Sequence, residues 1–120
     1  MSEIPYLYSW EAFTRDADLI AHTLRKKFAR KHFDGIYGIP RGGLVLAVTL
    51  SHRMKLPMLL APTKHSLVVD DIADTGETLR HYREIGAAIV TLFYHRQSIV
   101  IPDVWIREKK KKWIHYPWEA

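Results

Sequence analysis

The stretch LVVDDIADTGETL, residues 67–79, joins an apolar run to two adjacent aspartates and then to a short turn with hydroxyl groups and one glycine. Ligands of an open parallel sheet bind beyond the carboxyl ends of its strands, so the run predicts that Asp70 and Asp71 face a ligand. Successive strand residues point to opposite faces, so the two carboxylates should diverge. We expect one of them to bind a metal ion directly and the other to meet ligand hydroxyls or metal-bound water.

The turn ADTGET, residues 73–78, leads into a predicted helix, whose first backbone N–H groups are free to bind an anion. Gly76 permits a close approach, and the hydroxyl groups of Thr75 and Thr78 flank it, so the turn predicts a phosphate cradle. A P-loop and a Rossmann site are excluded, because neither the glycine-lysine-serine/threonine element nor the three-glycine fingerprint occurs. A cradle beside two carboxylates indicates a sugar phosphate. The plainer interpretation, in which the aspartates only cap a helix and solvate a turn, is less favoured for the whole string.

Segments of helical and strand character alternate around this stretch. Apolar residues from Trp10 to Phe28 recur every three or four positions behind Ser9, a typical helix N-cap. Further helices are predicted over residues 44–54 and 75–86, and strands over residues 35–39, 56–60, 67–71 and 87–94. Because the strands are continuously apolar, both faces of their sheet should be covered. The predicted fold class is α/β, a mainly parallel open sheet with helices on both faces.

The C-terminal part of the chain has a different character. Residues 102–119, PDVWIREKKKKWIHYPWE, contain two short aromatic segments separated by a charged turn, which predicts a small hairpin or lobe over the sheet edge. A chain of 120 residues suffices for one core. We therefore expect a single domain over residues 1–120, with a core of about residues 9–96 and an aromatic hood of about residues 100–120.

Composition narrows the classes of function. No apolar run reaches the ~20 residues of a membrane span, and the first residues do not resemble a secretory signal. The chain has no cysteine, which excludes disulfides and thiolate metal sites, and we expect a cytoplasmic protein without a membrane partner. The net charge of +5 is concentrated in residues 25–32 and 107–113. It indicates either solvated surface, which is favoured, or attraction of a phosphate-rich ligand or RNA.

Three segments together resemble one family. VVDDIADTGETL (residues 68–79) resembles the motif with which type I phosphoribosyltransferases bind 5-phosphoribosyl-1-pyrophosphate (PRPP). GIYGIPRGG (residues 35–43) resembles the pyrophosphate loop of that family, and WIHYPWE (residues 113–119) resembles the tail of its purine branch. The resemblance implies a Mg²⁺-dependent enzyme of purine salvage, which makes a nucleoside monophosphate and pyrophosphate from PRPP and a purine base. It also implies a homodimer.

The resemblance assigns roles in PRPP binding. Asp71 would be the Mg²⁺ ligand, and Asp70 would meet the ribose hydroxyls or metal-bound water. The peptide bond that enters the family's pyrophosphate loop is often cis, which predicts a cis bond between Pro40 and Arg41. The full set of implied PRPP-binding residues is Arg41, Gly42, Gly43, Asp70, Asp71, Ala73, Asp74, Thr75, Gly76, Glu77 and Thr78.

The purine base is the second substrate that the resemblance implies. Asp74 would be the catalytic residue that accepts the proton from purine N7. Trp113 would stack on the purine, with an ordinary core position as the alternative, and the Ile114 backbone would contact the purine's 2-position. Purine members usually carry a lysine after the last core strand, facing the 6-oxo group. His95 has that place here, and a neutral imidazole can donate one hydrogen bond to a carbonyl. The alternative for His95 is an ordinary surface histidine, which leaves the preference for a 6-oxopurine open.

The connection before the PRPP motif is short for the family, whose members usually have a long mobile loop that closes over PRPP. Here APTKHS, residues 61–66, takes its place, and we expect Lys64 and His65 to substitute for the loop in part. Three functions remain open. The enzyme is favoured over a catalytically weak or inactive regulatory protein that binds PRPP or a nucleotide and contacts RNA. An enzyme with a pyrimidine acceptor is the third.

Overall fold

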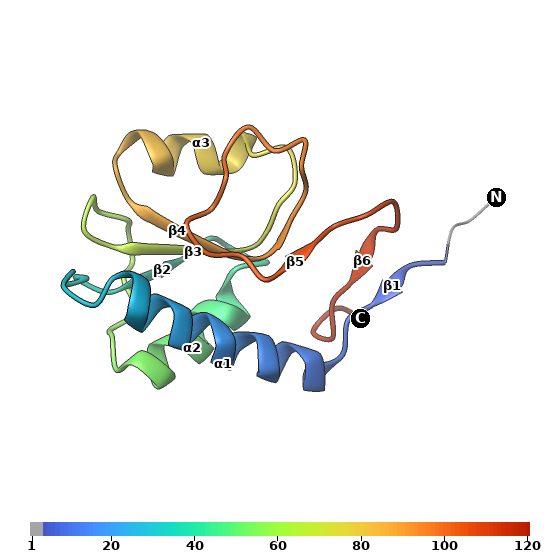
Figure 1. The fold of residues 1–120 in the computed structure, drawn as a ribbon, viewed down its shortest axis with the longest axis horizontal. Helices are drawn as coiled ribbons and strands as arrows, with labels where there is room; N and C mark the ends of the chain where they lie inside the picture. The colour runs from blue at the N-terminus through green and yellow to red at the C-terminus, as the bar shows by residue number, and fades with distance from the viewer. Residues whose placement is uncertain (1–3) are drawn as a thin grey trace.

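A parallel sheet of four strands forms the centre of the computed structural model, which describes residues 4–120 (Figure 1). Its strands lie side by side in the order β2 (Ile36–Gly38), β3 (Leu67–Ala73), β4 (Ala88–Tyr94) and β5 (Arg107–Glu108). The helices are α1 (Trp10–Lys27), α2 (Leu44–Met54) and α3 (Glu77–Glu84). Two short strands, β1 (Tyr6–Leu7) and β6 (Ile114–His115), pair in parallel with each other. The predicted α/β class with a parallel sheet is confirmed.

Helices cover both faces of this sheet. One face carries α1 and α2, whose Leu24 and Leu50 are buried in the same cluster as Val69 of β3. The other face carries α3, whose Leu79 is buried with Val68 of β3. Figure 1 shows this arrangement, with α3 above the sheet and α1 and α2 below it. Neighbouring residues of β3 therefore enter different clusters, as the pleat of a strand requires. No helix within residues 4–120 has the length and apolar character to cross a membrane.

Helix α1 begins where the sequence predicts. The Ser9 hydroxyl accepts a hydrogen bond from the backbone N–H of Ala12 at 3.0 Å, which caps the helix. Trp10, the first residue of the apolar pattern, is about half exposed rather than buried like most of the pattern. It lies at the hood end of α1, where its ring packs against Phe13 and Trp118 with centroid distances of 5.7 and 5.9 Å.

The strand predicted over residues 56–60 does not form, and that prediction is wrong. Met58 makes only one isolated parallel bridge, to Ile36, and Leu60 is fully exposed. The Pro57 carbonyl accepts a hydrogen bond from Ile36 at 2.8 Å. Proline has no N–H to donate, which stops a longer ladder at this edge of the sheet.

The C-terminal segments do not form the predicted hairpin. β5 pairs with β4 and extends the central sheet, whereas β6 pairs with β1 from the other end of the chain. An aromatic cluster is present nevertheless. The rings of Tyr116 and Trp118 stack at 4.9 Å, and Tyr116 also meets the rings of Tyr8 and Phe93 edge-on. The two C-terminal strands thus join different neighbours, and β6 pairs with a strand from the opposite end of the chain.

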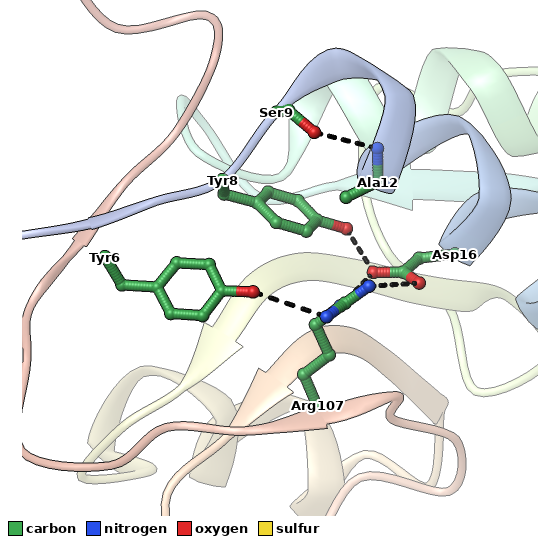
Figure 2. A network of polar contacts seen from close by, with 6 residues as sticks. All are labelled: Tyr6, Tyr8, Ser9, Ala12, Asp16 and Arg107. Carbon is green, nitrogen blue, oxygen red and sulfur yellow. Dashed lines mark hydrogen bonds and ion pairs between the residues drawn. The ribbon is translucent and has the colours of Figure 1, made fainter.

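A buried ion pair ties the hood to α1 and to the sheet (Figure 2). Asp16 of α1 is 5% exposed, and its carboxylate accepts hydrogen bonds from the Tyr8 hydroxyl at 2.5 Å and from Arg107 Nε at 2.6 Å. Arg107, which begins β5, also donates to the other Asp16 oxygen and to the Tyr6 hydroxyl, both at 3.3 Å. Burial, followed by the hydrogen bond to Asp16, raises the pKa of Tyr8, so its hydroxyl remains a donor. The carboxylate therefore has donors on both of its oxygens.

Candidate functional site

The carboxyl ends of the four parallel strands meet at one edge of the sheet, and a segment with polar residues follows each strand. Residues 39–43 follow β2, residues 74–76 follow β3, His95 follows β4, and Lys109 follows β5. Parallel strands end on the same side, so four separate parts of the chain come together there. Cavities of about 790, 660 and 180 Å³ are lined by these segments.

Asp70 and Asp71 lie within β3, which runs beyond its predicted end to Ala73. Both are partly buried, and the backbone N–H of Asp71 donates to Asp70 Oδ1 at 2.9 Å. Burial raises the pKa of Asp70 to about 8, with the charge of Asp71 as the second cause, and burial also raises the pKa of Asp71. Neither carboxylate forms an ion pair with any other residue in the range 4–120. The two carboxyl groups therefore lie side by side without a protein cation, and their surroundings favour a proton on Asp70.

This carboxylate pair fits a divalent cation that arrives with a substrate. Proteins usually hold Mg²⁺ through one or two carboxylates together with substrate phosphates and water. Within the described residues, 4–120, no three acidic, histidine or cysteine side chains form a metal site, so part of the donor set would be ligand oxygens. A cation would also offset the repulsion that contributes to the raised pKa of Asp70. Asp71 lines both the 660 Å³ and the 180 Å³ cavity, which makes it the better placed ligand.

The segment after β2 lies against Asp71. The peptide bond between Pro40 and Arg41 is cis, as the resemblance predicts. Gly42 approaches the Asp71 carboxylate, and Gly43 approaches the β3 backbone, so closely that a Cβ atom at either position would overlap its neighbour. Arg41 and Gly42 line the 660 Å³ cavity together with Asp71. The fold thus brings the predicted pyrophosphate-binding segment to the carboxylate pair.

The turn after β3 forms the 180 Å³ cavity, which is lined by Thr75, Gly76 and Thr78 as well as by the carboxylates. Gly76 has φ of 85° and directly precedes α3. This left-handed conformation favours glycine, and a Cβ atom would also overlap the Ser98 hydroxyl. The Thr75 carbonyl accepts a hydrogen bond from the Ile99 N–H at 2.8 Å, which fixes the turn on the loop after β4. The first N–H groups of α3 therefore border a rigid hollow.

Two residues of the predicted phosphate turn, residues 73–78, do not line this cavity. Ala73 is fully buried at the end of β3, and its carbonyl accepts a hydrogen bond from His95 N–H at 2.9 Å. The exposed side chain of Glu77 pairs with Arg80 at 3.0 Å. Ala73 and Glu77 can contribute to a phosphate site only through their backbone.

Asp74 is held from two sides. Its Oδ1 accepts a hydrogen bond from Gln97 Nε2 at 3.1 Å, and its Oδ2 accepts one from Lys109 Nζ at 3.2 Å. These two partners come from the loop after β4 and from the end of β5, so the carboxylate is oriented by the neighbouring strands. The sequence did not indicate either residue. Lys109 is the first of four consecutive lysines, and the sequence does not distinguish among them. The pairing of β5 with β4 places Lys109 at the carboxyl edge of the sheet.

The 790 Å³ cavity lies next to Lys109 and is lined by Tyr6, Phe93, His95 and Ile114 as well as by the lysine turn, residues 109–112. The ring of His95 is oriented by a hydrogen bond, since its Nδ1 lies 3.1 Å from the backbone N–H of Gln97. The structure therefore brings the predicted purine-binding residues His95 and Ile114 to one cavity with an apolar floor. Tyr6 is an aromatic residue of this cavity that sequence patterns did not indicate.

Trp113 does not line that cavity. Its side chain is 48% exposed, and its ring meets the ring of His115 edge-on at 6.4 Å. Successive residues of a strand point to opposite faces, so Trp113 and His115 share the face of β6 that Ile114 does not occupy. The structure thus separates the two predicted purine contacts of this segment.

Lys64 and His65 lie at the opposite edge of the sheet. They precede the first residue of β3, and the His65 carbonyl accepts a hydrogen bond at 3.0 Å from Asp34 N–H, which precedes β2. The full length of β3, seven residues or roughly 20 Å, separates them from the carboxyl edge. The expectation that these two residues substitute for a closing loop is therefore wrong.

The chain is similar in sequence to proteins named xanthine-guanine phosphoribosyltransferase. The one from Chromohalobacter salexigens is 26% identical over 139 aligned positions, which cover 95% of this chain and 83% of the relative. The one from Gluconobacter oxydans is 28% identical over 141 positions, which cover 93% of this chain and 83% of the relative. Both alignments exceed the 120 residues of this chain, so each relative has residues without a counterpart here. No protein-family model matches the chain.

The fold is similar to solved structures of the same kind of protein. A purine phosphoribosyltransferase from Pyrococcus horikoshii has a TM-score of 0.82 at 28% identity, covering 97% of this chain and 94% of that one. Helicobacter pylori xanthine-guanine-hypoxanthine phosphoribosyltransferase has a TM-score of 0.81 at 20% identity, covering 98% and 93%, and supports the fold. The predicted resemblance to the purine branch of the phosphoribosyltransferases, which are enzymes, is confirmed.

Proposed function

We propose that this chain is a Mg²⁺-dependent enzyme of purine salvage, which transfers the phosphoribosyl group of PRPP to a purine base. The observation that carries the proposal is the set of three cavities at the carboxyl edge, which share lining residues. Asp71 belongs to both the 660 Å³ and the 180 Å³ cavity, and Ile114 belongs to both the 660 Å³ and the 790 Å³ cavity. The reaction joins three groups at C1 of the ribose: the pyrophosphate, the ribose 5-phosphate and the base. Binding them together requires adjoining spaces of this kind.

Different residues of the carboxyl edge bind the different parts of PRPP. Arg41 and the backbone of Gly42 bind the pyrophosphate, since both line the 660 Å³ cavity together with Asp71. Gly43 supports this segment, because it packs against the β3 backbone and its N–H donates to the Ile39 carbonyl at 2.9 Å. The N–H groups at the start of α3 and the Thr75 hydroxyl bind the 5′-phosphate. Asp71 holds Mg²⁺, which when bound neutralises charge on the pyrophosphate. The resemblance alone supports the cytoplasmic location and the homodimer that we include in the proposal.

The reaction forms one bond and breaks another at C1 of the ribose. The purine N9 attacks C1, the bond from C1 to the pyrophosphate oxygen breaks, and pyrophosphate leaves with the electron pair. Positive charge develops on the ribose, so the carboxylate of Asp70 next to it stabilises the transition state. Asp74 accepts the proton that purine N7 loses, and Gln97 and Lys109 keep its carboxylate oriented.

A direct assay tests this proposal. The protein is incubated with PRPP and MgCl₂ and with guanine, hypoxanthine, xanthine or adenine, and both pyrophosphate and nucleotide are measured. We expect both products in equal amounts with at least one base. Binding of PRPP without product from any base would overturn the enzyme and would favour a regulatory binding protein.

The role of Asp74 has its own test. Asp74→Ala should lower kcat roughly 100- to 10,000-fold, because a positioned proton acceptor contributes that much. The Kd for PRPP should change far less, since the affected proton is on the base. Steady-state kinetics and calorimetry measure the two quantities, and Glu84→Ala, at the exposed far end of α3, is the matched control. Equal losses in kcat and in PRPP affinity would remove the special role of Asp74.

A further inference from the structure

Lys109 occupies a position between the phosphate turn and the 790 Å³ cavity. It follows β5 directly, and its backbone N–H donates to the Tyr94 carbonyl at 2.9 Å, which fixes its Cα beside the end of β4. Its side chain is only 20% exposed, and its Nζ lies 3.2 Å from Asp74 Oδ2. Lys109 also lines the cavity itself. A positive charge therefore stands at the entrance between Asp74 and the space for a base.

Lys109 pairs with Asp74 and not with the acidic residue next to it in the sequence. Glu108, the closest acidic residue in sequence, pairs instead with Lys110 at 2.8 Å and with Arg96 at 3.3 Å. The exposed Lys111 has no ion pair within residues 4–120. Among the four consecutive lysines, Lys109 is thus the one that β5 places against the carboxylate of the candidate catalytic residue.

The chemistry of a purine makes this position selective. The ring atom N7 and the substituent on C6 lie on the same edge of the base, close enough for one side chain to contact both. A purine whose N7 faces Asp74 therefore directs its C6 substituent at the cation bound to Asp74. A 6-oxo group is an acceptor for the ammonium, whereas the 6-amino group of adenine presents hydrogen atoms to it.

We infer that Lys109 is the residue that selects 6-oxopurines over 6-aminopurines, through a hydrogen bond from its ammonium group to the 6-oxo oxygen. The inference rests on the proposed function and assigns this role to a residue from β5 rather than to His95. In the structure Lys109 pairs with Asp74. When the base enters, the ammonium group binds the 6-oxo oxygen and leaves one carboxylate oxygen free for the proton of N7.

The test compares four forms of the full chain with hypoxanthine and adenine as acceptors. In the wild type we expect kcat/KM to favour hypoxanthine strongly. Lys109→Met should lower kcat/KM for hypoxanthine roughly 10- to 100-fold, as expected for one specific donor, with adenine nearly unaffected. Lys109→Arg should restore part of the preference. Lys26→Met removes the same charge from the exposed far end of α1, away from the three cavities, and should keep the preference.

A binding measurement separates this inference from the proposed function. Calorimetry with IMP and AMP reports the same discrimination without turnover, and thermal denaturation confirms that each variant is folded. Lys109→Gln, which keeps a polar side chain of similar length, replaces Lys109→Met if that variant does not fold. An unchanged preference for IMP over AMP in a folded Lys109 variant would overturn the inference. So would equal losses for both bases, which would mean that Lys109 only positions Asp74. Absence of product from the wild type with every base would overturn the proposed function, and the calorimetry would still decide the role of Lys109.

Discussion

Asp16 and the pair Asp70–Asp71 are both removed from solvent, but their surroundings differ. Asp16 receives hydrogen bonds on both oxygens, from the Tyr8 hydroxyl and from the guanidinium of Arg107. Asp70 and Asp71 form no ion pair within residues 4–120, and the side-chain oxygen of one accepts a backbone N–H of the other. Asp16 therefore has protein donors on both oxygens and a cationic partner, whereas Asp70 and Asp71 have no cationic partner among the described residues.

The difference separates a structural group from a ligand-binding one. A buried carboxylate that has its own cation contributes to the fold and has nothing left to offer a ligand. A pair of carboxylates with a raised pKa and no cation is destabilising on its own, and such groups concentrate at functional sites. Removing each kind of carboxylate should therefore have opposite effects on stability and on binding.

Asp16→Ala should give the largest loss of stability. It leaves the buried Tyr8 hydroxyl and the partly exposed Arg107 without their acceptor, and removing the partner of such hydrogen-bonding groups typically costs about 1 to 3 kcal/mol. Urea denaturation measures the free energy of unfolding. Asp18→Ala is the matched control on the same helix, because its side chain is 63% exposed although it also pairs with an arginine. Similar losses in both variants would contradict the comparison.

Asp71→Asn should have the opposite profile. We expect binding of PRPP in the presence of MgCl₂ to weaken at least about 10-fold, since the variant loses the charged oxygen that both cavities share. The melting temperature should not fall, because neutralising one carboxylate relieves the repulsion within the pair. Calorimetry and thermal denaturation measure the two quantities. A clear drop in stability would show that Asp71 is a structural group like Asp16.

Asp70→Asn should flatten the pH dependence of stability without Mg²⁺. An acid whose pKa is higher in the folded than in the unfolded state stabilises the fold while it is protonated, and this contribution is lost as the pH rises. For Asp70 the window extends from about 3.8 to about 8. We expect the free energy of unfolding of the wild type to decrease across this window relative to the variant. Urea titrations at a series of pH values check this, and parallel curves would argue against it.

Tyr116→Phe should have the smallest effect. The Tyr116 hydroxyl is buried and has no hydrogen-bond partner among residues 4–120, so its removal should raise the free energy of unfolding by about 1 kcal/mol or leave it unchanged. Tyr8→Phe is the matched control, because the same change there removes a donor to the Asp16 carboxylate and should lower stability. A similar decrease in the free energy of unfolding of both variants would contradict the difference between the two hydroxyl groups.

Much of the site could be predicted from local patterns, because it lies on elements that are local in the sequence. The run into Asp70 and Asp71, the glycine turn at Gly76 and the cap at Ser9 form as expected. Patterns failed where a distant partner decides the outcome. β6 pairs with β1 from the start of the chain rather than with β5, and the parallel pairing of β5 with β4 distinguishes Lys109 from the three lysines that follow it. The strand predicted over residues 56–60 is reduced to one bridge, from Met58 to Ile36, and Pro57 has no N–H to extend it.

The pairing of β1 with β6 has a practical consequence for anyone who attaches an affinity tag. Tyr6 of β1 lines the cavity assigned to the base, and Ala120 lines the one assigned to pyrophosphate. Figure 1 shows β1 and the C-terminus at the same end of the molecule. A tag joined close to Tyr6 or directly to Ala120 would therefore lie beside one of these two cavities, and binding assays call for a tag that is removed before the measurement.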